Sequence, residues 1–187
     1  MYKESLTLNN GVKIPQLGLG TWFIDDDKVA GAVKEATKLG YRHFDTAQAY
    51  GNERGVGEGI RTCEIKPMVN QILLHISNTP IELMEYCQKN DIAVEAYSPI
   101  AHGEILNQPE IVAMAEKYGV SVPQLCIRYT LQLGAISLPK TGNPEHMKTN
   151  GEVEFEISPE DMEVLKSFKH IESYGDSGVF PVYGGKL

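Results

Sequence analysis

Short apolar segments alternate with amphipathic helical segments along most of the chain, and this alternation limits its possible folds more than any other feature. Strands are expected at residues 16–20, 41–45, 68–72, 92–98 and 135–139. Helices are expected at 25–40, 52–61, 80–90, 109–118 and 121–133, and two more begin at 144 and 159. Strands that alternate with helices, without long linkers, are typical of an α/β fold in which helices cover a parallel sheet.

Local signals mark the ends of several elements. Residues 5–14 alternate around Asn9-Asn10-Gly11, which predicts an N-terminal β-hairpin because Asn and Gly accept the positive φ of a tight turn. Capping-box patterns run from Thr79 to Glu82 and from Ser121 to Gln124, each at a helix start. The tail from residue 173 is rich in Gly and Pro, so neither helix nor strand is expected there.

Composition excludes several classes of protein. The chain has 187 residues and a net charge of −8, which argues against nucleic acid as a partner and requires a local basic group for any anionic cofactor. Its apolar runs are too short for a membrane span, and its start lacks the layout of a signal peptide. Cys63, Cys87 and Cys126 lack metal-ligand spacing. We therefore expect a cytoplasmic protein with reduced thiols and no bound metal.

The stretch GYRHFDTAQAYGNERGVG, from Gly40 to Gly57, places two titratable groups where a short strand ends. Asp45 closes the predicted strand, and Tyr50 follows in a turn beside a glycine. Taken alone, Asp45 is more often a turn former and Tyr50 ordinary packing. The surrounding residues decide between these interpretations and a catalytic site.

Those surrounding residues closely resemble the first signature of the aldo-keto reductases, which are NAD(P)H-dependent carbonyl reductases. The matching residues are Gly40, Tyr41, Arg42, Asp45, Glu53 and Gly57. Four other stretches agree in the family's order: GLGTW at 18–22, VNQILLHIS at 69–77, VEAYSPIAHG at 94–103 and LPKTGNPEHMKTN at 138–150. The resemblance implies a TIM-type (β/α)8 barrel that reduces an aldehyde or ketone to an alcohol.

One part of the family pattern is missing near residues 62–64, where family strands three to five are expected. A complete barrel typically has about 250 residues, more than this chain contains. We therefore predict a single, partial domain over 1–187: an incomplete barrel with about five parallel strands, which match family strands one, two, six, seven and eight. Bare edges on strands two and six favour self-association, because an unpaired edge is a template for another chain.

By resemblance, Tyr50 matches the tyrosine that protonates the substrate oxygen, and Asp45 matches the aspartate that supports the site. The family's catalytic lysine and histidine belong to the missing part. None of His43, His75, His102 and Lys66 falls on their family positions. The alternative is a catalytically inactive remnant that binds a dinucleotide or self-associates. A barrel enzyme of other chemistry, such as a lyase acting on a phosphorylated substrate, is the third interpretation.

The cofactor side is better preserved. By resemblance, the residues that contact the dinucleotide are Thr21, Trp22, Gln71, Tyr97, Ser98, Ile100, Lys140, Thr141 and Asn150. Tyr97 stacks on the nicotinamide ring, and Lys140 and Thr141 hold the phosphate on the adenosine side. His146 replaces the family arginine that grips the NADP 2′-phosphate, and histidine lacks the bidentate fork. NADP(H) is expected ahead of NAD(H). Without this context, Tyr97 would more often be a core residue and Lys140 a surface residue.

Overall fold

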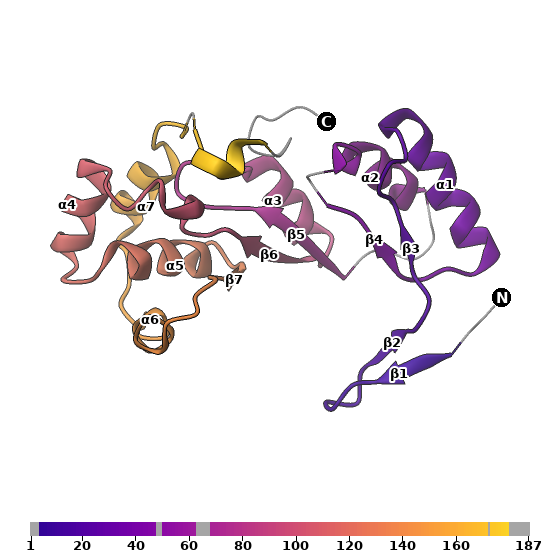
Figure 1. Cartoon of the computed structure of the whole chain (residues 1–187), viewed down its shortest axis with the longest axis horizontal. Helices are drawn as coiled ribbons and strands as arrows, with labels where there is room; N and C mark the ends of the chain where they lie inside the picture. Colours follow the sequence, from indigo (N-terminus) through magenta and orange to yellow (C-terminus); the bar gives the residue numbers. More distant parts are fainter. Residues whose placement is uncertain (1–3, 48–49, 63–67, 172, 180–187) are drawn as a thin grey trace. The chain divides into compact units, whose positions relative to one another are not determined.

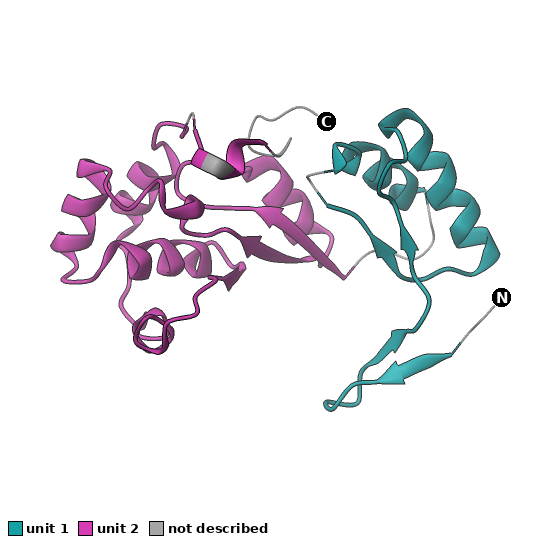
Figure 2. Cartoon of the chain, in the orientation of Figure 1, with its two compact units in different colours: residues 1–67, 180–187 teal, residues 68–179 magenta. Residues whose placement is uncertain are grey.

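The computed structural model describes residues 4–62 except 48–49, and residues 68–179 except 172 (Figure 1). The chain separates into two compact units, Met1–Pro67 with Phe180–Leu187 and Met68–Val179 (Figure 2). Cys63, Lys66 and most of the predicted join at 62–64 lie outside the described residues. No helix in the described ranges is long and apolar enough to cross a membrane.

The first unit begins with the expected hairpin. Strands β1 (Ser5–Thr7) and β2 (Lys13–Pro15) pair antiparallel, with Leu6 opposite Ile14. Gly11 has a φ of 86° in the connecting turn, a conformation that glycine adopts without steric cost. The prediction from the Asn-Asn-Gly sequence is confirmed.

A βαβα segment follows in the same unit. Strand β3 (Leu19–Gly20) pairs parallel with β4 (Phe44–Asp45), and helix α1 (Asp26–Leu39) connects them. Gly40 ends α1 in the left-handed conformation, as its position predicted. Helix α2 (Glu53–Arg61) packs on α1, and their buried contact centres on Val29, Val33 and Val56.

The second unit is built on a parallel sheet in the order β5-β6-β7. The strands are β5 (Val69–Leu73), β6 (Ala93–Tyr97) and β7 (Ile136–Leu138), and Gln71 pairs with Glu95 in the register. The helices are α3 (Ile81–Lys89), α4 (Pro109–Lys117), α5 (Val122–Gln132), α6 (Pro144–Asn150) and α7 (Pro159–Lys166). The buried sheet face forms a core from Ile72, Leu74, Cys87, Ile92, Val94, Ala96 and Ala135.

The alternate residues of these strands form the opposite face, which is more open, although Leu73 at the end of β5 is buried. Val69 is 50% exposed, Ile136 47% and Leu138 40%. These residues alternate along the strands with the buried ones, as the two-residue period of a strand requires. Within the described part of this unit, helices therefore bury one face of the sheet more fully than the other.

Two local predictions were wrong. Thr79 does not cap α3: its hydroxyl lies 2.7 Å from the Tyr129 hydroxyl and donates to the carbonyl of His75 at 3.2 Å. Tertiary partners replace the capping bond there, whereas the Ser121 capping box forms as predicted. The tail also contains a 3₁₀ helix, η3 (Gly175–Val179), where no regular structure was expected.

The five expected parallel strands are present, but they are divided between two sheets. Among the described residues, β3-β4 and β5-β6-β7 are separate, and no closed barrel forms. A barrel needs an uninterrupted ladder around its circumference. Here β3 and β4 each have two residues, so they offer little ladder on which to continue.

Candidate active site

The first group of predicted site residues lies where β3 and β4 end. The backbone N–H and the hydroxyl of Thr21 both donate to the carbonyl oxygen of Asp45, at 3.1 and 3.0 Å. Thr21 is fully buried, so these bonds hold the two strand ends together from inside. The structure thus places Thr21 and Asp45 side by side, as expected for parts of one site.

Asn52 is a site residue that the sequence analysis missed. Its buried side-chain amide donates to the carbonyls of Thr21 and Ile24, both at 2.8 Å, and its oxygen accepts from the Thr46 hydroxyl at 3.2 Å. These bonds fix the loop after β3 to the start of α2. The sequence signal at Asn52 is a polar residue directly before a helix, and by itself this pattern indicates only a helix cap.

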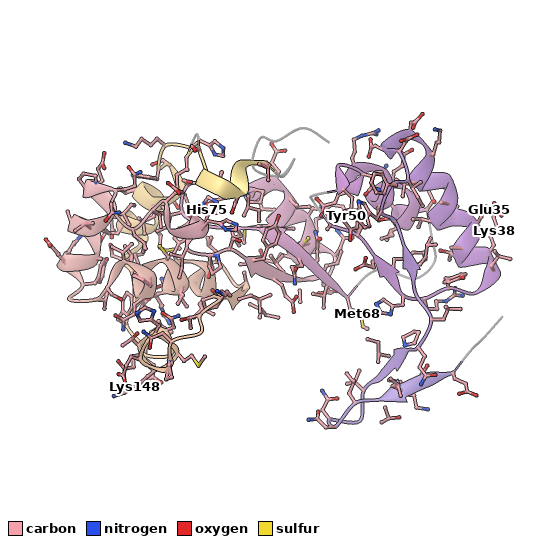
Figure 3. The ribbon with its side chains drawn as sticks, viewed as in Figure 1. Glu35, Lys38, Tyr50, Met68, His75 and Lys148 are labelled. Carbon is pink, nitrogen blue, oxygen red and sulfur yellow. The ribbon has the colours of Figure 1, made fainter. Side chains whose placement is uncertain are left out.

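Tyr50 and Trp22 come together in an exposed aromatic stack. Their ring centroids are 6.1 Å apart and the ring planes differ by 20°, while Phe23 stacks on Trp22 at 4.8 Å. Trp22 is 63% and Phe23 81% exposed, and Figure 3 shows Tyr50 in this unit. Phe23 has a φ of 59°, which is unfavourable for a bulky residue. The turn therefore holds two aromatic side chains at the surface beside Tyr50.

The carboxylate of Asp45 is exposed to solvent. Among residues 4–47 and 50–62, no ion pair or side-chain hydrogen bond involves this carboxylate. An uncompensated carboxylate is far less costly in water than in a protein interior. Within these ranges Asp45 is thus exposed and has no cationic partner, whereas the family resemblance implies a lysine there.

The remaining predicted residues lie in the second unit: Gln71 is in the middle of β5, and the others lie at or after the carboxyl ends of β6 and β7. Gln71 donates to the Glu95 carboxylate at 3.1 Å across the open sheet face, so its amide already has a protein partner. Tyr97 is half-buried at the end of β6. Carboxyl ends of parallel strands lie at one edge of a sheet, so the segments after β6 and β7 begin at the same edge.

The segment after β7 is exposed. Lys140 is exposed, and the hydroxyl of Thr141 accepts from the backbone N–H of Asn143 at 3.1 Å. Asn143 caps α6 by accepting from the N–H of Glu145 at 3.0 Å. His146 is also exposed, on α6, and Asn150 ends that helix. A cation and a hydroxyl thus follow β7 in succession, and both can donate to a phosphate.

The segment after β6 carries a second network that the sequence did not reveal. Ser98 Oγ lies 3.1 Å from His102 Nε2, and Ser177 Oγ lies 3.1 Å from His102 Nδ1. Buried Tyr174 places its hydroxyl 3.0 Å from His75 Nε2. The His102–Ser177 and His75–Tyr174 pairs join residues 75 and 99 positions apart in the chain, so no local pattern predicts them.

His75 is the buried centre of this network. Its Nδ1 lies 3.2 Å from Ser77 Oγ, and Figure 3 shows the residue within the second unit. Burial, with smaller contributions from His170 and His102, lowers the pKa of His75 to about 3. The ring is therefore neutral near pH 7, and a neutral imidazole offers one donor and one acceptor to the two hydroxyls. This role is structural and agrees with its position off the family's catalytic positions.

The comparisons with known proteins identify a family. The sequence model of the Aldo/keto reductase family matches residues 16–64 and 58–170. Glyoxal reductase of Bacillus subtilis is 26% identical over 263 residues, which cover 92% of this chain and 95% of that protein. An aldo/keto reductase structure from Brucella melitensis matches with a TM-score of 0.53 and 26% identity, over 88% of this chain and 98% of that one.

A Bombyx mori aldo-keto reductase solved in complex with NADP shows the same fold, with a TM-score of 0.57 and 21% identity over 98% of this chain and 99% of that chain. The alignment with the Bacillus protein runs over 263 positions and this chain has 187 residues, so at least 263 − 187 = 76 positions face no residue here. The two segments matched by the family meet at residues 58–64.

Proposed function

Since the chain belongs to the aldo/keto reductase family, we propose that its reaction is the NAD(P)H-dependent reduction of an aldehyde or ketone to an alcohol. The observation that carries this proposal is the placement of Tyr50 against Trp22, next to the strand end that bears Asp45. Tyr50 is partly exposed beside this aromatic turn, and in the proposal its hydroxyl meets a small carbonyl compound there. The family implies a carbonyl substrate, and a relative is named a glyoxal reductase.

In this proposal a residue of the chain, Tyr50, donates the proton. The reduced nicotinamide, when bound, supplies a hydride to the carbonyl carbon. The Tyr50 hydroxyl donates its proton to the carbonyl oxygen, which takes up the π electron pair and becomes the alcohol. A free tyrosine has a pKa of about 10, so proton donation at neutral pH needs a neighbour that stabilises the phenolate. A carboxylate such as that of Asp45 does not stabilise a second anion, so this neighbour would have to be a cation.

We further propose that the lysine and histidine of the family site are absent from this chain. The 76 or more unmatched alignment positions and the meeting of the matched segments at 58–64 support this proposal. Among residues 4–47 and 50–62, no cation pairs with the Asp45 carboxylate, which accords with this proposal. In that case the chain would still bind the dinucleotide but would reduce its substrate slowly or not at all. The inactive remnant is the second candidate, and the same observations favour it.

The donors in the second unit fit a dinucleotide. Lys140 and Thr141 offer a cation and a hydroxyl to a phosphate, and the half-buried ring of Tyr97 offers an aromatic face. The relative from Bombyx mori was solved with NADP, which supports NADP(H) as the cofactor here. His146, in place of the family arginine, leaves NAD(H) as the competing cofactor.

Turnover separates the two candidates. We expect NADPH oxidation with glyoxal to be slow in the wild-type protein and to fall at least about a hundredfold in Tyr50→Phe, since general-acid catalysis is typically worth that much. The matched control is Tyr86→Phe, because Tyr86 is an exposed tyrosine on α3. An equal rate in Tyr50→Phe and wild type would exclude Tyr50 as the acid. A wild-type rate equal to the buffer blank would favour the inactive remnant.

Cofactor binding is measured separately by titrating NADPH fluorescence. Lys140→Ala should weaken binding about tenfold, equal to roughly 1.4 kcal/mol, because one phosphate contact is lost. Lys148→Ala is the matched control: it removes another exposed lysine of the same unit, from helix α6 (Figure 3). Equal losses in the two variants would show only a general effect of charge and would contradict a specific contact at Lys140.

A further inference from the structure

The loop that follows β6, residues 98–103, has an unusual backbone. Ser98, Ala101 and His102 have φ values of 50°, 48° and 55°, and Gly103 has 96°. A non-glycine residue in this region is strained, and it persists only where the surroundings hold it. Three such residues in one short loop require strong restraints. Strained residues of this kind cluster in loops that bind ligands or take part in catalysis.

His102 supplies two of these restraints. Its Nε2 lies 3.1 Å from the Ser98 hydroxyl, which closes the loop on itself. Its Nδ1 lies 3.1 Å from the hydroxyl of Ser177, in η3, 75 positions along the chain. Both ring nitrogens are therefore engaged, one within the loop and one with the C-terminal segment. Hydroxyl groups donate or accept as needed, so either neutral tautomer of the ring satisfies both contacts.

Tyr174 anchors this C-terminal segment. Its side chain is buried and its hydroxyl lies 3.0 Å from Nε2 of His75, just after β5. The rings of His102 and Tyr174 meet edge to face, with centroids 6.3 Å apart and planes at 90°. Residues 174–177 therefore touch segments that follow both β5 and β6. The His102–Ser177 contact lies at the more exposed end of this arrangement.

We propose that His102 is a positioning residue for the dinucleotide: it holds the 98–103 loop in its binding conformation by linking it to η3. This inference rests on the proposed function and on the family resemblance, which places Ser98 and Ile100 among the residues that contact the dinucleotide. When the loop is already held in this conformation, none of the binding free energy of the dinucleotide is lost in ordering it. Linkage is reciprocal, so a bound dinucleotide tightens the contact between the loop and η3 by the same factor.

A purely structural His102 would behave differently. It would change the melting temperature when replaced, but NADPH affinity would stay the same once the variant is folded. A positioning role also predicts that His102 and Ser177 act as one unit. Replacing either breaks the link, so replacing both loses little more than replacing one.

The test measures NADPH affinity by fluorescence titration in wild type, His102→Ala, Ser177→Ala and the double variant. We expect each single variant to bind about five- to tenfold more weakly, within the usual range of coupling between sites. The double variant should lie within about twofold of the single variants. Ser167→Ala is the matched control, because Ser167 is an exposed serine at the end of α7 whose hydroxyl donates to the Val164 carbonyl.

Hydrogen exchange gives a second readout. NADPH should slow amide exchange in residues 173–179 of the wild type and have a smaller effect in His102→Ala, and circular dichroism should show both proteins folded. Wild-type affinity in both single variants would overturn the positioning role and leave the proposed function intact. A wild-type protein that binds no dinucleotide would overturn the proposed function and this inference with it.

Discussion

At the scale of single residues, His75 shows how the fold sets the charge of a side chain. The ring is fully buried, and His170, His102 and the hydroxyls of Ser77 and Tyr174 surround it. Burial lowers its pKa from 6.5 to about 3. Between these two values the unfolded chain binds a proton at this histidine that the folded chain does not. Folding is therefore opposed increasingly as the pH falls below 6.5.

We predict that the free energy of unfolding falls by about 1.4 kcal/mol per pH unit below 6.5 because of His75. The measurement compares urea unfolding of wild type and His75→Gln from pH 8 to pH 4. The difference between the two proteins isolates His75, because carboxylates titrate alike in both. Above pH 7 this difference should be constant, and below 6.5 it should shift in favour of the variant. A difference that stays constant down to pH 4 would contradict the assigned pKa.

At the scale of elements, the packing of α2 on α1 depends on two glycines of α2, although glycine is a poor helix former. A Cβ atom at Gly55 would lie 2.1 Å from the carbonyl oxygen of Asp26, and one at Gly59 would lie 2.7 Å from Val33 Cβ. The N–H of Gly55 also donates to the Asp26 carboxylate at 2.7 Å. The two helices approach closely because these residues lack side chains.

We predict that Gly55→Ala destabilises the protein by about 1–3 kcal/mol, the usual cost of overpacking, because the helices must separate. Gly57→Ala is the matched control: a Cβ at Gly57, in the same helix, meets nothing within 4 Å. It should stabilise by about 0.5–1 kcal/mol through helix propensity. Thermal unfolding of both variants measures the effects. Equal changes in the two would contradict the close-packing argument.

At the scale of the whole molecule, the exposed strands of the second unit favour self-association. Among the described residues, β5 pairs on one side only, with β6, and Val69 on this strand is half exposed. Parallel sheets are normally covered on both faces and rarely leave apolar residues in water. An edge of this kind pairs readily with another chain.

We predict that the protein self-associates through β5 and that Val69→Lys weakens the association, since charge on an edge opposes pairing. Sedimentation velocity over a wide range of concentration measures it against the monomer mass of 20.7 kDa. Val164→Lys serves as the control, because Val164 is an equally exposed valine on helix α7. Concentration-independent sedimentation of the wild type at the monomer mass would refute the prediction.

Most elements could be predicted because their signals are local. The expected strand at 68–72 is found as Val69–Leu73, and the expected helix at 121–133 as Val122–Gln132. Period and capping residues act within a few positions of the chain, so the sequence contains them directly. Thr79 shows the limit of this approach, because a tertiary partner, Tyr129, competed with the predicted capping bond.

The candidate site also has parts that the sequence predicts and parts that depend on tertiary contacts. The sequence by itself determined the family, through the signature residues between Gly40 and Gly57 and four further stretches. Only the tertiary structure decided that Trp22 stacks on Tyr50, that Asn52 ties the loop after β3 to α2, and that His102 joins Ser98 to Ser177. The structure also divided the five parallel strands between two sheets. These outcomes depend on contacts between residues far apart in the chain, and such contacts form only when the chain folds.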